Sequence, residues 1–217
     1  MAKTYGQFCS TARALDVVGD RWALLVVREL LLGPCRFTDL LTGLPGIGTN
    51  VLSTRLRELE AAGVVERRRL PAPTPVTLYQ LTPAGQDLRQ VVDALARWGS
   101  RRLDLPAHGD VLEPRWLVLS LTASVKPPAE LEDGATIRLR IEYEEFIMTV
   151  DDGSFVARRG AGETADAVLL GPLADFFAAA KGDRRAADRI ALDGDAALGR
   201  SFLAAVVGAL APTDARS

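Results

Sequence analysis

Residues 53–81 read STRLRELEAAGVVERRRLPAPTPVTLYQL, and this stretch has the pattern of a helix followed by a basic hairpin. On an ideal helix that begins near Thr49, three leucines share one narrow arc and four polar residues take the opposite side. The leucines predict a packed face, which leaves the polar side free to contact a partner. The leucines are Leu52, Leu56 and Leu59, and the polar residues are Asn50, Ser53, Thr54 and Arg57.

The second part of the stretch predicts two strands. Gly63 stands where a left-handed cap would end the helix, and Val64 opens an extended run that carries three arginines. Residues 76–81 resume the extended pattern after three prolines, so the prolines mark the tip of a hairpin. A helix with a positively charged hairpin is suited to reading duplex DNA. The arginines are Arg67, Arg68 and Arg69, and the prolines are Pro71, Pro73 and Pro75.

The charge of the chain is divided unevenly along its length. The chain has 217 residues, of which 48% are hydrophobic and 25% are charged, as is ordinary for a globular protein. Residues 1–105 hold 14 Lys and Arg against 10 Asp and Glu, whereas residues 106–217 hold 12 against 18. A basic front and an acidic back predict two domains, of which only the first approaches phosphate.

The composition disfavours several classes of protein. No apolar stretch approaches the ~20 residues that span a bilayer, and the start of the chain lacks the apolar core of a secretion signal, so we expect a cytoplasmic protein with no membrane partner. Cys9 and Cys35 are too few for a disulfide scaffold and are not clustered with histidine as in a zinc site. We expect no metal, no cofactor and no enzyme activity, because a Ser/His/Asp or Cys/His set and a phosphate-binding glycine loop are missing.

The residues before the quoted stretch predict the rest of a winged helix. A first helix is expected over Thr11–Val18, and Asp20 is placed to cap a second over Arg21–Leu32. A short third helix around residues 37–41 is followed by a tight turn at residues 44–48. Helix, turn, helix and hairpin is the winged-helix order. In that fold the second helix of the pair enters the major groove, and the hairpin lies along the adjacent backbone or minor groove.

Several motifs in register make the first half resemble the HxlR family of winged-helix transcription regulators. The similarity covers nearly all of residues 5–104. Members of that family are homodimers that bind inverted-repeat operators, so the resemblance implies double-stranded DNA and a second copy of the chain as partners. The motifs are Gly19-Asp20-Arg21-Trp22, Arg36-Phe37, Leu56-Arg57-Glu58-Leu59 and Leu81-Thr82-x-x-Gly85.

Seven residues are candidates for contacts with DNA. Those in the helix are suited to reading bases, because Arg and Asn can pair bidentately with guanine and adenine edges. The wing arginines are suited to phosphate, which sets affinity and salt dependence, and a solvated charge run is the alternative. Arg55 borders the packed face and is expected to pair with Glu58 or Glu60. The candidates are Asn50, Ser53, Thr54 and Arg57 in the helix and Arg67, Arg68 and Arg69 in the wing.

Residues 83–103 carry an apolar stripe at helical spacing. Two copies of this stripe, with the first helix beside it, can pack across a two-fold axis. The alternative is that the stripe packs only on its own domain. The stripe consists of Leu88, Val91, Val92, Leu95, Trp98 and Leu103.

The two cysteines differ in what the resemblance implies for them. Cys9 lies where thiol-sensing members of the family carry their redox cysteine, so it is a candidate sensor. A small packing residue is the alternative for Cys9. Cys35 departs from the family pattern, and a pairing between the two cannot be argued from that pattern.

The second half predicts a domain of strands and helices after a proline-rich linker around His108. Residues 116–124 are apolar enough for either a helix or a strand. Alternation of apolar and polar residues predicts antiparallel strands, with a hairpin at Asp152-Gly153. Gly171-Pro172 begins an amphipathic helix. The strands are expected over residues 136–143, 145–151, 154–159, 165–170 and 190–195, and the final helix over residues 198–210.

This order of elements, which ends in ALDGDAALGRSFLAAV at residues 191–206, resembles the sterol-carrier-protein-like lipid-binding fold over about residues 115–210. The resemblance implies an apolar tunnel that holds a lipid or another hydrophobic small molecule. Apolar residues at these spacings also fill ordinary cores, so a packed core is the alternative. The expected lining is Leu139, Phe146, Met148, Phe155, Phe176, Phe177, Phe202 and Val206.

The sequence therefore predicts an α+β protein with a winged helix-turn-helix followed by a sterol-carrier-like sandwich, whose mainly antiparallel sheet has about five strands. The expected domains are residues 1–105 for DNA binding and dimerisation, 106–114 as linker, 115–211 for ligand binding and 212–217 as tail. The expected function is a homodimeric transcriptional regulator whose DNA affinity responds to a hydrophobic ligand. The alternative is a lipid carrier or sequestering protein in which the first half only dimerises.

Overall fold

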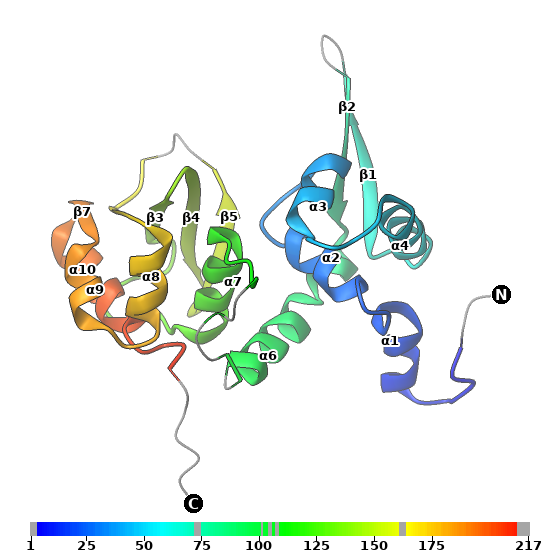
Figure 1. Ribbon diagram of the computed structural model, residues 1–217, viewed down its shortest axis with the longest axis horizontal. Coiled ribbons are helices and arrows are strands. Elements are labelled where there is room, and N and C mark those ends of the chain that lie inside the picture. Colours follow the sequence, from blue (N-terminus) through cyan, green and yellow to red (C-terminus); the bar gives the residue numbers. More distant parts are fainter. Residues whose placement is uncertain are drawn as a thin grey trace, which may run out of the picture. The chain divides into compact units, whose positions relative to one another are not determined.

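A computed structural model of the chain describes residues 4–71, 75–100, 102–103, 106, 109–160 and 164–211. The chain forms two compact units, Met1–Val92 and Asp93–Ser217, each of which has its own core (Figure 1). Three features expected from the sequence lie outside the described residues. They are Pro73 at the wing tip, the linker residue His108 and the tail 212–217.

The first unit is a bundle of helices with a two-stranded wing. The helix α4 lies against β1, whereas α2 and α3 lie against β2 (Figure 1). Residues at the buried positions of α2 and α4 are almost all aliphatic, so the helices bury one continuous core. The elements are α1 (Ser10–Val18), α2 (Ala23–Leu30), α3 (Phe37–Gly43), α4 (Thr49–Ala61), β1 (Val65–Leu70), β2 (Val76–Leu81) and α5 (Pro83–Gln86).

The expected role of Asp20 as the cap of the second helix was wrong. The helix α2 begins at Ala23, because residues 20–22 form a turn in which the Ala23 N–H donates to the carbonyl of Asp20 over 3.0 Å. The carboxylate of Asp20 instead pairs with Arg55 at 2.9 Å. Arg55 also pairs with Glu58, as expected, so this side chain joins α4 to the turn before α2.

The wing extends from the helical core as an antiparallel hairpin. In its register Val65 stands opposite Leu81 and Leu70 opposite Val76. Cys35 forms an isolated antiparallel β-bridge with Tyr79, since its N–H donates to the Tyr79 carbonyl over 3.0 Å and its own carbonyl accepts from the Tyr79 N–H over 2.8 Å. The base of the wing is therefore held from both sides.

Residues 83–103, whose apolar spacing indicated a single helix, form two helices, and the stripe residues Val91, Val92, Leu95 and Trp98 lie in the second of them. The short helix α5 ends at Gln86 with Asp87 as its cap, and α6 (Arg89–Ser100) begins two residues after that cap. Arg89 fixes the start of α6 because its Nη2 donates to the carbonyl of Leu31 over 3.1 Å. Leu103 lies beyond the end of α6.

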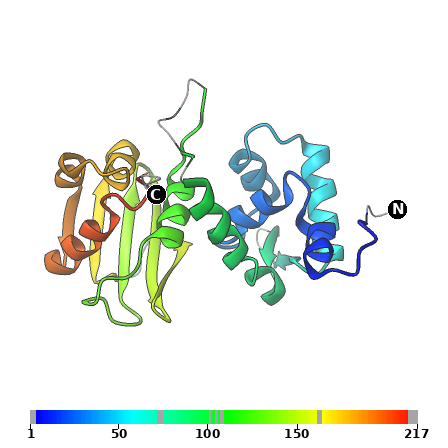
Figure 2. The same ribbon diagram turned by 90° about the horizontal axis from the view of Figure 1, so that it is seen from below.

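The second unit contains a five-stranded sheet whose strands lie side by side in the order β5-β4-β3-β6-β7 (Figure 2). The strands pair antiparallel except β3 and β6, which are parallel. This agrees with the expected mainly antiparallel sheet of about five strands. The strands are β3 (Thr136–Ile141), β4 (Glu144–Asp151), β5 (Ser154–Arg159), β6 (Ala167–Gly171) and β7 (Ala191–Gly194).

Helices cover the apolar face of this sheet. The helix α7 lies against β4 and β5, and α10 lies against β6 and β7. The segment for which helix and strand were both open is the helix α7, which begins at Pro114, a residue that the first turn of a helix accepts. The helix α9 was not predicted, and it is capped by Asp183, whose carboxylate accepts from the Arg185 and Ala186 N–H groups. The helices are α7 (Pro114–Ser124), α8 (Leu173–Ala180), α9 (Arg184–Arg189) and α10 (Ala196–Val206).

Candidate nucleic-acid interface

The helix α4 is amphipathic in the way that its sequence predicts. Its leucines Leu52, Leu56 and Leu59 are fully buried. Gly63 follows the helix with a φ of 70°, a left-handed conformation that glycine adopts without strain. The helix therefore ends where the sequence indicated, and its polar side is turned away from the core.

The four predicted base-reading residues all lie in the first three turns of α4. Asn50 and Arg57 are exposed, and Ser53 and Thr54 are half-buried. Arg57 folds back along its own helix, since its Nη2 donates to the Thr54 hydroxyl over 3.2 Å and its Nε to the Ser53 carbonyl over 3.4 Å. The structure thus brings Ser53, Thr54 and Arg57 together, with Asn50 one turn earlier.

Thr82 explains the motif Leu81-Thr82-x-x-Gly85 in physical terms. Its hydroxyl accepts from the Gly85 N–H over 3.1 Å, which caps α5. The same hydroxyl donates to the carbonyl of Gly63 over 2.5 Å, at the point where α4 ends. One side chain therefore ties the end of the wing to the end of the candidate recognition helix.

The three wing arginines differ in their surroundings. Arg68 and Arg69 are exposed, and they have no ion-pair partner among the described residues. The Nη2 of Arg67 lies 2.6 Å from the carboxylate of Glu60, and its guanidinium carbon lies 5.5 Å from the centre of the Tyr79 ring. The hydrogen bond to Glu60 and the nearby Tyr79 raise the pKa of Arg67. Of the three, Arg67 is thus already engaged by the protein.

Sequence reasoning missed Glu60 and Tyr79 as parts of this surface. Glu60 precedes the helix cap at Gly63, so its partner Arg67 lies beyond the reach of helical spacing. The signal that could have found the pair is a carboxylate in the last turn of a helix followed by a basic strand after a short turn. Tyr79 could have been found from the hairpin register, because it stands directly opposite Arg67.

The helix α6 carries an exposed apolar stripe. Val91 is 42% exposed, Leu95 48% and Trp98 57%, and the three lie on one side of the helix. Isolated apolar residues on a surface are ordinary, but three at helical spacing form a contiguous patch. This patch is where the sequence placed a dimer contact.

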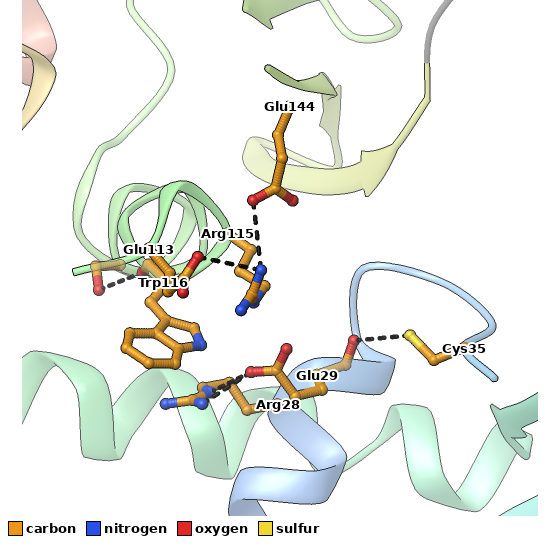
Figure 3. A network of polar contacts seen from close by, with 8 residues as sticks. Arg28, Glu29, Cys35, Glu113, Arg115, Trp116 and Glu144 are labelled. Carbon is orange, nitrogen blue, oxygen red and sulfur yellow. Dashed lines mark hydrogen bonds and ion pairs between the residues drawn. The ribbon is translucent and has the colours of Figure 1, made fainter. Parts of the chain in front are cut away.

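The two cysteines have opposite environments. Cys9 is exposed at the start of α1, where the backbone N–H groups of Ala12 and Thr11 lower the pKa of its thiol. Cys35 is buried, and Figure 3 shows its sulfur directed at the backbone carbonyl of Glu29, 3.8 Å away. Of the two, only Cys9 is open to solvent.

The second unit holds an ionic cluster around a buried arginine that the sequence did not predict. Arg115, at the start of α7, lies 3.2 Å from Glu113 and 3.4 Å from Glu144 at the start of β4 (Figure 3). Buried charges of this kind are costly unless paired, so the cluster fixes the start of α7 on the sheet. Within the described ranges no three His, Cys, Asp or Glu side chains gather closely enough to hold a metal ion.

The eight residues expected to line a tunnel are all buried in the second unit. Phe155 and Phe202 meet edge to face with ring centres 5.4 Å apart. A cavity of about 380 Å³ opens elsewhere in the unit and shares only Phe177 with the expected lining. Its lining residues are Arg102, Leu103, Pro106, Asp110, Val111, Leu112 and Phe177.

Comparison with known proteins places the first half in a family. The sequence model of the HxlR-like helix-turn-helix family matches residues 17–106. The HTH-type transcriptional regulator sll1512 of Synechocystis is 36% identical over 99 residues, which cover 46% of this chain and 73% of the relative. The regulator YvaP of Bacillus subtilis is 39% identical over 93 residues, which cover 42% of this chain and 85% of the relative.

Solved structures include the redox regulator HypR in its oxidized form, which is 32% identical with a TM-score of 0.42 and covers 45% of this chain and 100% of that chain. Among the helices that the structure describes, none combines the length and the apolar character needed to cross a bilayer. The helix-turn-helix order of the first unit agrees with the family match and with the helix-turn-helix class named for sll1512 and YvaP. The chain belongs to the HxlR-like helix-turn-helix family of DNA-binding transcriptional regulators.

Proposed function

We propose that this protein is a homodimeric regulator that binds an inverted-repeat operator through α4 and the β1–β2 wing. One observation carries the proposal. The polar side of α4 and the exposed arginines of β1 belong to adjacent elements of one unit, joined through Thr82 and Gly63. A helix that enters the major groove with a wing beside it needs this arrangement.

The residues of α4 are suited to reading base edges. Arg57 can pair bidentately with guanine and Asn50 with adenine, and Ser53 and Thr54 can contact either. In the free protein Arg57 donates to Thr54, so it exchanges that contact for a base when DNA binds. Arg68 and Arg69 in the wing have the exposure that phosphate contacts need.

The exposed stripe of α6 is proposed as the contact between two copies of the chain. Val91, Leu95 and Trp98 would be buried by the same three residues of the partner across a two-fold axis, as an isologous interface requires. Removal of exposed apolar surface from water favours such a contact. A dimer also presents two α4 helices, which matches an operator with two half-sites.

The second unit is proposed to bind a hydrophobic small molecule, in a domain that spans residues 115–211 after a linker at 106–114. Its five-stranded, mainly antiparallel sheet with helices on the apolar face supports this role, because it is consistent with the sterol-carrier-like fold that the order of elements resembles. A ligand can shift operator affinity only if it binds the two dimer geometries unequally, typically by ~1–3 kcal/mol.

Two linked measurements test the proposal. Native mass spectrometry of the purified full-length protein should show a dimer and any molecule that remains bound to it. A gel shift on the DNA upstream of the protein's own coding sequence should show a sequence-specific complex, whose affinity changes when the bound molecule is removed. A monomer that binds every duplex equally would contradict the regulator, and unchanged affinity would contradict the ligand-dependent part.

A further inference from the structure

The alternation of β1 gives its three arginines different surroundings. Side chains two residues apart on a strand share a face, so Arg67 and Arg69 lie on the same face as Val65, and Arg68 lies on the other. Val65 is buried against the core, which makes Arg67 the first charged residue outward from that core on this face of β1. Arg69 stands opposite Thr77, nearer to the wing tip.

The guanidinium of Arg67 connects three elements. It lies 2.6 Å from Glu60 in the last turn of α4 and above the ring of Tyr79 on β2. Tyr79 is itself fixed by its two backbone hydrogen bonds with Cys35. The angle between α4 and the wing is therefore constrained by a chain of contacts that passes through Arg67.

The charges of this pair cancel. Glu60 belongs to the helix proposed to approach DNA, where an unpaired carboxylate would repel phosphate. Arg67 neutralises it, so the pair adds no net charge to the surface, whereas Arg68 and Arg69 each add one positive charge. Both members are partly exposed, and exposed pairs contribute little to stability. Its main effect is therefore on geometry.

We propose that Arg67 is a positioning residue, which holds the wing at a fixed angle to α4 through Glu60, and that the phosphate contacts of the wing come from Arg68 and Arg69. This inference rests on the proposed DNA contacts of α4 and the wing and assigns different roles within them. Of the three consecutive arginines, two would then contact phosphate and one would hold the wing in place.

The substitution Glu60→Gln distinguishes a positioning role of Arg67 from a phosphate contact, because the two roles predict opposite changes in DNA affinity. If Arg67 positions the wing, loss of the carboxylate loosens the wing, and specific binding weakens as it does in Arg67→Met. If Arg67 contacts phosphate, loss of the carboxylate releases the guanidinium and removes a repulsive charge, so binding tightens. The probe is a labelled duplex selected from a random-sequence pool by the full-length protein, with fluorescence anisotropy as the readout.

The expected result is that Glu60→Gln and Arg67→Met each weaken specific binding on the order of tenfold, and that the double variant is no weaker than either alone, because contacting residues that act together are not additive. The salt dependence of binding is expected to stay at the wild-type slope in both. Arg68→Met and Arg69→Met are the matched controls, and each should reduce the slope of log K against log salt by about 0.9. The exchanged pair Glu60→Arg with Arg67→Glu should recover most of the specific binding.

Three outcomes would overturn the inference. Tighter binding by Glu60→Gln with a steeper salt slope would make Arg67 a phosphate contact. Additive losses in the double variant, with no recovery in the exchanged pair, would show that the two residues act independently. A wild-type protein that binds no duplex would remove the proposed function and this inference with it, which distinguishes that failure from the first two.

Discussion

Gly85 lies so close to the backbone carbonyl of Val64 that a Cβ on residue 85 would stand 2.1 Å from that oxygen. The clash would be with backbone at the junction of α4 and the wing, which cannot move aside cheaply. We therefore expect Gly85→Ala to lower the free energy of unfolding by about 3 kcal/mol or slightly less, at the upper end of the range for overpacking. Chemical denaturation followed by circular dichroism measures this change.

Gly99 in α6 provides the matched control, since a Cβ there would meet no atom within 4 Å. Gly99→Ala is expected to be neutral or to stabilise the protein by roughly 0.5–1 kcal/mol, because alanine is the better helix former. Equal effects of the two substitutions would show that the close approach of residue 85 to Val64 is not what requires glycine.

Asp166 makes the stability of the second unit depend on pH. The N–H and the hydroxyl of Thr136 donate to its carboxylate over 2.7 and 2.9 Å, and these hydrogen bonds lower the pKa of Asp166. Because the folded pKa lies below the unfolded value, the contribution is fully present above the unfolded pKa of about 4 and is lost as the pH falls through the folded pKa.

Asp166→Asn should therefore lower the free energy of unfolding at neutral pH, and its difference from the wild type should shrink once the pH falls below about 4. Urea unfolding at a series of pH values measures that difference. If the difference in free energy of unfolding between the variant and the wild type were the same at every pH, the account would be contradicted.

Cys9 should react with iodoacetamide at lower pH than an ordinary thiol. The backbone N–H groups of Ala12 and Thr11 lower the pKa of its thiol, and the thiolate is the reactive form. Mass spectrometry of alkylated peptides across a pH series should show Cys9 labelled early and the buried Cys35 unlabelled in the native state. Cys9→Ser is the control. Equal labelling of both cysteines would remove Cys9 as a candidate redox site.

The stripe of α6 gives a test of the dimer. Leu95→Glu would place a charge at the centre of the proposed interface beside Trp98, so sedimentation should show a shift towards monomer. Gln90→Glu is the matched control, because residue 90 is exposed on another side of the same helix and acquires the same charge. An unchanged dimer in Leu95→Glu would place the contact elsewhere on the molecule.

Local patterns in the sequence were enough to predict much of the fold. The leucine spacing of α4, the cap at Gly63 and the turn at Asp152-Gly153 depend on residues within a few positions of each other, and the structure has them there. Long-range contacts were not predictable. Asp20 has the local sequence pattern of a helix cap, but its carboxylate pairs with Arg55, which lies far along the chain.

The candidate site likewise has features that local sequence predicts and features that depend on long-range contacts. Exposure of Asn50 and Arg57 follows from helical periodicity, whereas the engagement of Arg67 by Glu60 depends on how the chain turns at Gly63. The parallel pairing of β3 with β6 likewise depends on where the chain returns to the sheet. The alternation of apolar and polar residues along one strand does not indicate which strand lies beside it.

The most direct test of the proposed operator reading is the discrimination of Arg57→Ala between a selected operator duplex and a scrambled duplex of the same length and composition, measured by anisotropy at one salt concentration. The account predicts a loss of roughly 1–3 kcal/mol of discrimination, as for one bidentate base contact, with little change in binding to the scrambled duplex. Arg200→Ala, an exposed arginine on α10, should leave both affinities unchanged. Discrimination by Arg57→Ala equal to that of the wild type would contradict the account.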